Sequence, residues 1–238
     1  MERIKLKEKI KIERTLGERF VMAFRHFLEA NKQKVIYSLV FLVLLVLIGL
    51  GVVVYVDSTN NKQLVSFENL IEDYNKIIES PEKDSEDNKE KIQETVASLK
   101  QLVEESRFGF LAEMGNYILG NIFFDTKNYN EAIISLLKFS ENSQSTTFVP
   151  LALQKAALAR EENKDLDGAL ELYKKLEENY LDSIIVDQIY YNLGRIYQQK
   201  KDTKEAKKYF DKVISLHAQS PLADQAKKRI FLLDWEEK

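Results

Sequence analysis

The chain has 238 residues, of which 45% are hydrophobic and 31% charged, and its formal net charge at pH 7 is −3. It has no cysteine, which excludes a disulfide framework, a thiolate metal site and a cysteine nucleophile. Only eight glycines and three prolines occur, and the segments between them are rich in Leu, Ile, Ala, Glu and Lys. This composition predicts an all-α protein.

Residues 1–34 are basic, with ten Lys and Arg against five Asp and Glu, so the rest of the chain is acidic. Between Leu16 and Leu28, apolar residues recur at helical spacing, while Arg19 and Arg25 lie elsewhere on the helix. These apolar residues are Leu16, Phe20, Phe24, Phe27 and Leu28. A basic amphipathic helix of this kind is expected to lie on anionic lipid headgroups. A basic tail without structure, which only sets membrane topology, is the alternative.

Residues 35–56 form an apolar stretch, VIYSLVFLVLLVLIGLGVVVYV, that contains no charged side chain. At about 1.5 Å per residue, one helix of this length spans the roughly 30 Å hydrocarbon core of a bilayer. The stretch is long for a signal peptide, and no small-residue cleavage site follows it, so we expect an uncleaved anchor. Lys32 and Lys34 precede it and Asp57 follows it. The positive-inside rule therefore places the N-terminus in the cytoplasm and the C-terminal part outside.

Residues 57–110 are predicted to form two linking amphipathic helices that pack on the domain that follows. The apolar positions of the first are Leu64, Phe67, Leu70, Ile71, Tyr74, Ile77 and Ile78. Pro81 lies in a polar loop that ends this helix. The apolar positions of the second are Ile92, Val96, Leu99, Leu102 and Val103.

Residues 111–238 repeat with a period of 37. The aligned columns are Gly120, Ala157 and Gly194; Ala132, Ala169 and Ala206; and Leu136, Tyr173 and Phe210. Small residues such as Gly194 and Ala206 allow two helices of a pair to approach closely. The columns predict an α-solenoid of about three helix pairs, and residues 222–236 are expected to form its C-terminal capping helix.

This pattern resembles tetratricopeptide repeats, most clearly in Leu193-Gly194 followed by Tyr197, and in Ala206 followed by Phe210. The middle unit departs from the pattern, with Ala156-Ala157 in place of Leu-Gly. The layout of a single span before a repeat domain resembles the YfgM-like ancillary subunits of the Sec translocon. That resemblance implies an inner-membrane protein with a periplasmic domain that associates with the translocon and with periplasmic chaperones.

No arrangement typical of an enzyme, and no metal or cofactor motif, is visible. The two histidines, His26 and His217, are separated by the predicted span. Three acidic pairs are interpreted as solvated helix faces, namely Glu104-Glu105, Glu161-Glu162 and Glu177-Glu178. We therefore expect a protein without catalytic activity, cofactor or nucleic-acid partner.

Binding is expected on the concave surface formed by the first helix of each unit. The residues predicted to line this groove are Tyr117, Asn121, Phe124, Gln154, Leu158, Glu161, Tyr191, Arg195, Gln198 and Lys228. Tyr191 and Arg195 lie one helical turn apart and belong to residue types enriched in binding hot spots. In the alternative interpretation, Tyr191 packs on a neighbouring repeat and Arg195 pairs with an acid such as Glu161.

The sequence predicts a single-pass inner-membrane protein whose periplasmic repeat domain binds translocon subunits, periplasmic chaperones or exported clients. A scaffold for envelope assembly or for coordination of cell division is one alternative. A structural membrane protein that self-associates into a homo-oligomer is the other.

Overall fold

The computed structural model describes residues 16–82 and 85–236, and every regular element in this part of the chain is an α-helix. Contacts divide the chain into two units, residues 1–57 and residues 58–238. The helices are α1 (Leu16–Ala30), α2 (Lys32–Glu79), α3 (Glu86–Glu105), α4 (Gly109–Asp125), α5 (Tyr129–Asn142), α6 (Phe148–Glu162), α7 (Leu166–Asn179), α8 (Val186–Gln199), α9 (Thr203–Leu216) and α10 (Pro221–Glu236). The all-α fold class is confirmed.

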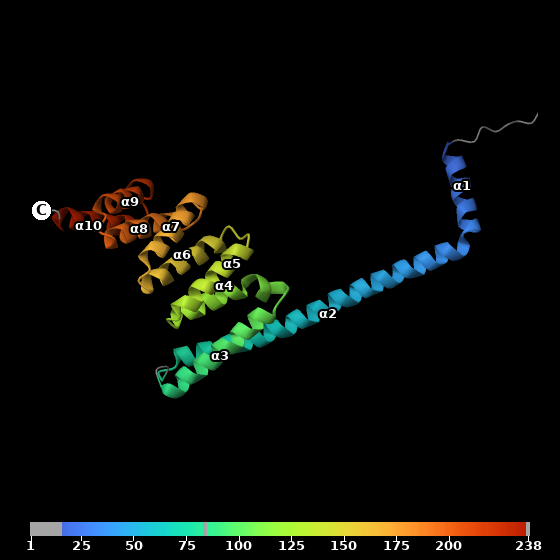
Figure 1. Cartoon of the computed structure of the whole chain (residues 1–238), viewed down its shortest axis with the longest axis horizontal. Coiled ribbons are helices and arrows are strands. Elements are labelled where there is room, and N and C mark those ends of the chain that lie inside the picture. Colours follow the sequence, from blue (N-terminus) through green and yellow to red (C-terminus); the bar gives the residue numbers. More distant parts are fainter. Residues whose placement is uncertain (1–15, 83–84, 237–238) are drawn as a thin grey trace, which may run out of the picture. The chain divides into compact units, whose positions relative to one another are not determined.

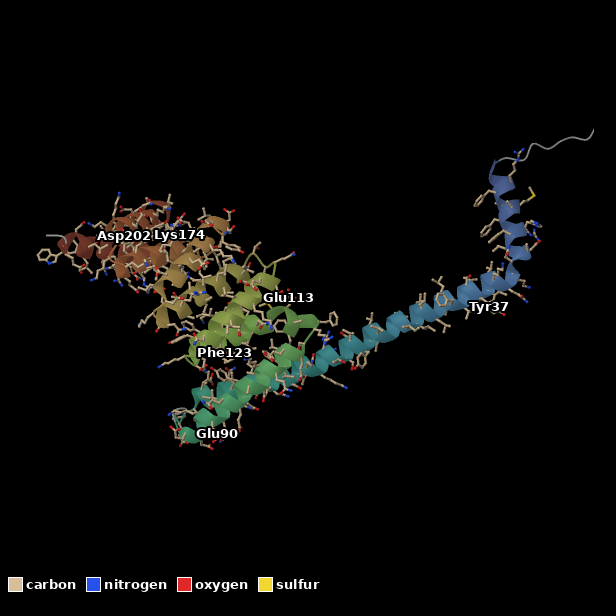
Figure 2. The ribbon with its side chains drawn as sticks, viewed as in Figure 1. Tyr37, Glu90, Glu113, Phe123, Lys174 and Asp202 are labelled. Carbon is tan, nitrogen blue, oxygen red and sulfur yellow. The ribbon has the colours of Figure 1, made fainter. Side chains whose placement is uncertain are left out.

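The first unit contains α1 and the apolar part of α2. By length and composition α2 is able to cross a membrane, and none of the residues in its apolar stretch is buried. Apolar side chains project from this segment around Tyr37 (Figure 2). The polar residues after Asp57 do not interrupt α2, since neither glycine nor proline occurs between Asp57 and Glu79. The predicted span and the first linking helix are therefore one continuous helix.

The second unit begins with the end of α2 and with α3, which precede the repeats. Phe67 and Tyr74 of α2 are buried in the same core as Leu99 of α3. The α2 helix ends at Glu79, two residues before Pro81, as expected. Ser85 caps α3 by accepting a hydrogen bond of 3.3 Å from the backbone N–H of Asn88.

Helices α4 to α10 stack in chain order, and each contacts the next (Figure 1). The pairs are α4 with α5, α6 with α7, and α8 with α9. A Cβ atom on Gly120 would lie 2.5 Å from Leu136 Cγ, and one on Gly194 would lie 2.6 Å from Phe210 Cε1. These distances leave no room for a methyl group, which confirms that the small-residue column permits close approach within each pair.

Each pair turns through a lysine with positive φ, which the sequence pattern did not predict. Lys127, Lys164 and Lys201 have φ values of 62°, 64° and 63° and recur at the 37-residue period. After Lys164, the N–H of Asp165 donates to the carbonyl of Arg160 at 2.9 Å, and equivalent bonds close the other two turns. This is the Schellman arrangement, in which glycine usually occupies the left-handed position.

Helix α10 covers the end of the stack and contacts α8 and α9. Its inner face buries Ala223, Ala226 and Leu233. Its outer face exposes three large apolar side chains, with Phe231 67%, Leu232 49% and Trp235 70% accessible. A terminal repeat helix commonly presents a polar outer face, whereas this one mixes large apolar side chains with charged ones such as Lys228.

Candidate functional site

The residues predicted to line the concave groove come from α4, α6, α8 and α10, but they differ greatly in accessibility. Lys228 is exposed. Six are half-buried, namely Tyr117, Asn121, Phe124, Leu158, Arg195 and Gln198. The remaining three are buried, namely Gln154, Glu161 and Tyr191. The buried residues are unavailable to a partner, so their placement in an open groove is corrected.

Tyr191 is only 9% exposed because neighbouring helices cover it. Its ring centroid lies 5.6 Å from that of Phe210 on α9, and its hydroxyl donates to Oε1 of Gln225 on α10 at 3.2 Å. Gln154 likewise donates through Nε2 to Oε1 of Gln188 at 2.9 Å. Through these hydrogen bonds Gln154 connects α6 to α8 and Tyr191 connects α8 to α10, and both side chains are buried.

Glu161 is the centre of a buried polar network between the second and third pairs. The residue is 8% exposed, and its carboxylate accepts hydrogen bonds from the Tyr173 hydroxyl at 2.8 Å and from Arg195 Nη2 at 2.9 Å. Burial, together with the charge of Glu161, raises the pKa of Tyr173 well above its ordinary value. Arg195 also donates to Asn192 Oδ1 at 3.0 Å. This geometry matches the alternative in which Arg195 pairs with Glu161.

A second acidic residue, Glu177 on α7, is enclosed by side chains of α9. The interpretation of Glu177 as part of a solvated helix face is therefore wrong. Its carboxylate accepts from Lys212 at 2.7 Å, from Lys174 at 3.0 Å and from the Tyr209 hydroxyl at 2.9 Å. Burial opposes ionisation, but these donors outweigh it and hold the pKa of Glu177 below its ordinary value. Lys174 is labelled on this part of the stack in Figure 2. The cluster joins α7 to α9, which are the second helices of two successive pairs.

The predicted aromatic groove residues of α4 also pack between helix pairs. The Tyr117 ring lies 5.2 Å from Phe139 and 5.4 Å from Phe148, measured between centroids. Phe124 lies 5.5 Å from Tyr129, and the Lys155 ammonium is 5.0 Å from its ring centre. The contacts with Phe148 and Lys155 hold the first pair against the second, whereas those with Phe139 and Tyr129 lie within the first pair. Together they leave only part of each ring accessible.

A groove that the sequence did not predict lies between the end of α2 and α4. Its volume is about 460 Å³. We call it the α2–α4 groove, and it is lined by Leu64, Phe67, Glu68, Ile71, Glu72, Asn75, Lys76, Glu79, Phe110 and Ile118. The apolar periodicity of residues 64–78 predicted that this face of α2 is apolar, but it did not predict that α4 forms the other wall of the groove. Among the described residues, no cluster of three or more potential ligands is arranged to hold a metal ion.

Comparison with known families identifies tetratricopeptide repeats. One model of this repeat matches residues 151–183, and another matches residues 187–219. These ranges correspond to the pairs α6–α7 and α8–α9, so the chain contains at least two tetratricopeptide repeats. The repeat is a module for protein–protein interaction.

Two solved structures resemble the chain. The crystal structure of MamA shares 20% identity, with a TM-score of 0.50 over 65% of this chain and 83% of that one. The crystal structure of BtubC from P. vanneervenii shares 15% identity, with a TM-score of 0.45 over 73% and 82%. At this identity, the likeness to MamA supports the fold alone. No curated protein matches the chain.

Proposed function

We propose that this protein is a membrane-anchored adaptor whose tetratricopeptide repeats bind a protein partner, and that it acts by binding and not by catalysis. The observation that carries the proposal is the joining of such repeats to an apolar helical segment of which no residue is buried. An apolar surface of that size is unfavourable in water and is accommodated by a bilayer.

The flanking charges support an orientation with the repeats outside the cytoplasm. Lys32 and Lys34 precede the apolar residues and Asp57 follows them. In this orientation the repeats lie in the periplasm, where the layout shared with YfgM-like proteins favours a role beside the translocon. Exported clients and periplasmic chaperones are the partners that fit that position.

Helix α1 forms a second membrane contact in this proposal. Phe20, Phe24 and Phe27 lie on one side of the helix, and all three are largely exposed. Arg19 and Arg25 lie outside this apolar side, so the helix suits the boundary between acyl chains and headgroups. Only Asn31 separates α1 from α2, which keeps α1 close to any bilayer that α2 crosses.

Orientation is tested by cysteine labelling, since the native chain has no cysteine. In spheroplasts, an impermeant maleimide should label Lys175→Cys on α7 at once, and Arg25→Cys on α1 only after lysis. The reverse pattern would place the repeats in the cytoplasm and remove the translocon role.

The partner is tested by crosslinking in intact membranes followed by affinity purification. Recovery of translocon or chaperone components supports export. Recovery of outer-membrane assembly or division components instead would favour the scaffold function, and recovery of neither would contradict the adaptor proposal.

A further inference from the structure

The α2–α4 groove combines an apolar floor with an acidic rim. Leu64 and Ile71 of α2 face Phe110 and Ile118 of α4 across it, and Phe110 is 49% exposed. The volume of about 460 Å³ lies within the range of about 300–1,000 Å³ typical of pockets that bind ligands. The floor therefore offers room for large apolar side chains.

The rim carries Glu68, Glu72 and Glu79 against the single cation Lys76. The Lys76 ammonium is already 2.8 Å from the Glu72 carboxylate and 3.6 Å from that of Asp73. Within residues 16–82 and 85–236, Glu68 has no hydrogen-bond or ion-pair partner. The groove thus favours an occupant that brings an apolar surface together with positive charge.

The outer face of α10 combines apolar side chains with Lys228, and the acidic residue one turn earlier on that face, Asp224, is already paired with Lys227 at 2.9 Å. Lys228, Phe231, Leu232 and Trp235 occur at positions i, i+3, i+4 and i+7, and all four are exposed. This is the spacing by which one face of a helix anchors in an apolar groove. The buried residues Ala226 and Leu233 lie on the opposite side, so docking through the outer face leaves the packing of α10 on α9 intact.

We propose that the α2–α4 groove binds α10 of a second copy of this chain. Phe231 and Trp235 enter the apolar floor, and Lys228 approaches the unpaired carboxylate of Glu68. The groove lies at the first helices of the second unit and α10 at the last, so the contact joins two different surfaces. Repeated from copy to copy, a heterologous contact of this kind forms a ring or an open row of copies.

Mass measurements on the full-length protein in mild detergent test the contact. Light scattering should give a mass that rises with concentration beyond two chains. Trp235→Glu should raise the concentration for half-assembly roughly tenfold or more, as expected for the loss of a central aromatic anchor. Ile134→Glu, at an exposed apolar position on α5, is the matched control and should leave assembly unchanged.

Charge reversal gives a second, independent arm. Glu68→Lys and Lys228→Glu should each weaken assembly, and the double variant should recover at least part of it, since the two charges exchange places. All substituted positions are exposed, so helicity and thermal unfolding should stay at native values.

Crosslinking locates the interface. A chain with Leu232→Cys mixed with a chain carrying Glu72→Cys should form a bismaleimide product, whereas Ile134→Cys in place of Glu72→Cys should not. A monomeric mass at every concentration would overturn the proposal, as would assembly that is unaffected by Trp235→Glu. Binding of an unrelated basic amphipathic peptide to a monomeric protein would assign the groove to a different occupant and would also overturn it. None of these three results bears on membrane orientation or on capture of a partner.

Discussion

Replacing Arg195 with methionine tests whether this residue stabilises the stack or recognises a partner. The substitution removes the donor 2.9 Å from the Glu161 carboxylate, which then keeps Tyr173 and the 3.4 Å contact from Gln199. Removing one partner of a fully buried ion pair costs roughly 3–5 kcal/mol. The Arg195 side chain is 27% exposed, so water replaces part of the interaction, and we expect a loss of about 2–3 kcal/mol.

For a chain of this length, each kcal/mol lowers the melting temperature by roughly 2–4 °C, so Arg195→Met should melt about 4–12 °C below the native protein. Urea denaturation of the full chain in mild detergent, followed by circular dichroism, gives the free energy of unfolding. Glu161→Gln and the double variant complete a thermodynamic cycle, for which we expect a coupling of about 1–2 kcal/mol.

Two results would refute this reasoning. The first is a loss below about 0.5 kcal/mol for Arg195→Met with coupling near zero, because adjacent members of one network rarely behave additively. The second is unchanged stability with loss of partner capture, which would restore Arg195 as a recognition residue.

Three further predictions concern the repeats, and each uses the same unfolding assay. Gly194→Ala places a methyl group 2.6 Å from Phe210 Cε1, so overpacking of about 1–3 kcal/mol should outweigh the gain in helix propensity of about 1 kcal/mol. The double variant Gly194→Ala with Phe210→Leu should recover much of the lost stability. A single Gly194→Ala variant that is more stable than the native protein would contradict this packing. Lys164→Gly should stabilise the protein by about 0.5–1 kcal/mol, because glycine adopts a φ of 64° without strain. The control Lys175→Gly, inside α7, should destabilise it by about 1 kcal/mol. Equal effects at both positions would argue against the turn geometry. The pKa of Glu177 is lowered in the folded state, so the stability that its ionised carboxylate contributes is complete above the ordinary pKa of 4.5. That contribution is lost as pH falls from there through the lowered folded-state pKa. Glu177→Gln should therefore flatten the acid side of the profile of stability against pH, and an unchanged profile would count against the cluster.

The repeat architecture was predictable because the backbone fixes it. Positions where two helices of a pair touch, such as Gly194 and Ala206, must hold small residues. That requirement appears in the sequence as columns of small residues at a fixed period. The turn lysines recur at the same 37-residue period, but lysine gives no sign of a left-handed backbone. Only the structure identifies Lys164 as the residue that closes its turn.

The binding surface was harder to predict because polar and aromatic side chains choose their partners in three dimensions. Spacing on one helix places Tyr191 and Arg195 on an accessible side, but Gln225 from α10 and Glu161 from α6 reach them from neighbouring helices. The α2–α4 groove lies where α2, which is outside the 37-residue period, meets the first helix pair, so no aligned column of the sequence marks Phe110 as part of its wall.

Trp235 gives the protein a natural optical probe at one defined position. It is the only tryptophan in the chain, and it lies 70% exposed on α10. Its emission reports the polarity around that helix and is insensitive to events confined to α1 or to the Glu161 network. A blue shift on concentration would therefore signal dehydration of the terminal helix itself, and it would be readable without a label or any substitution.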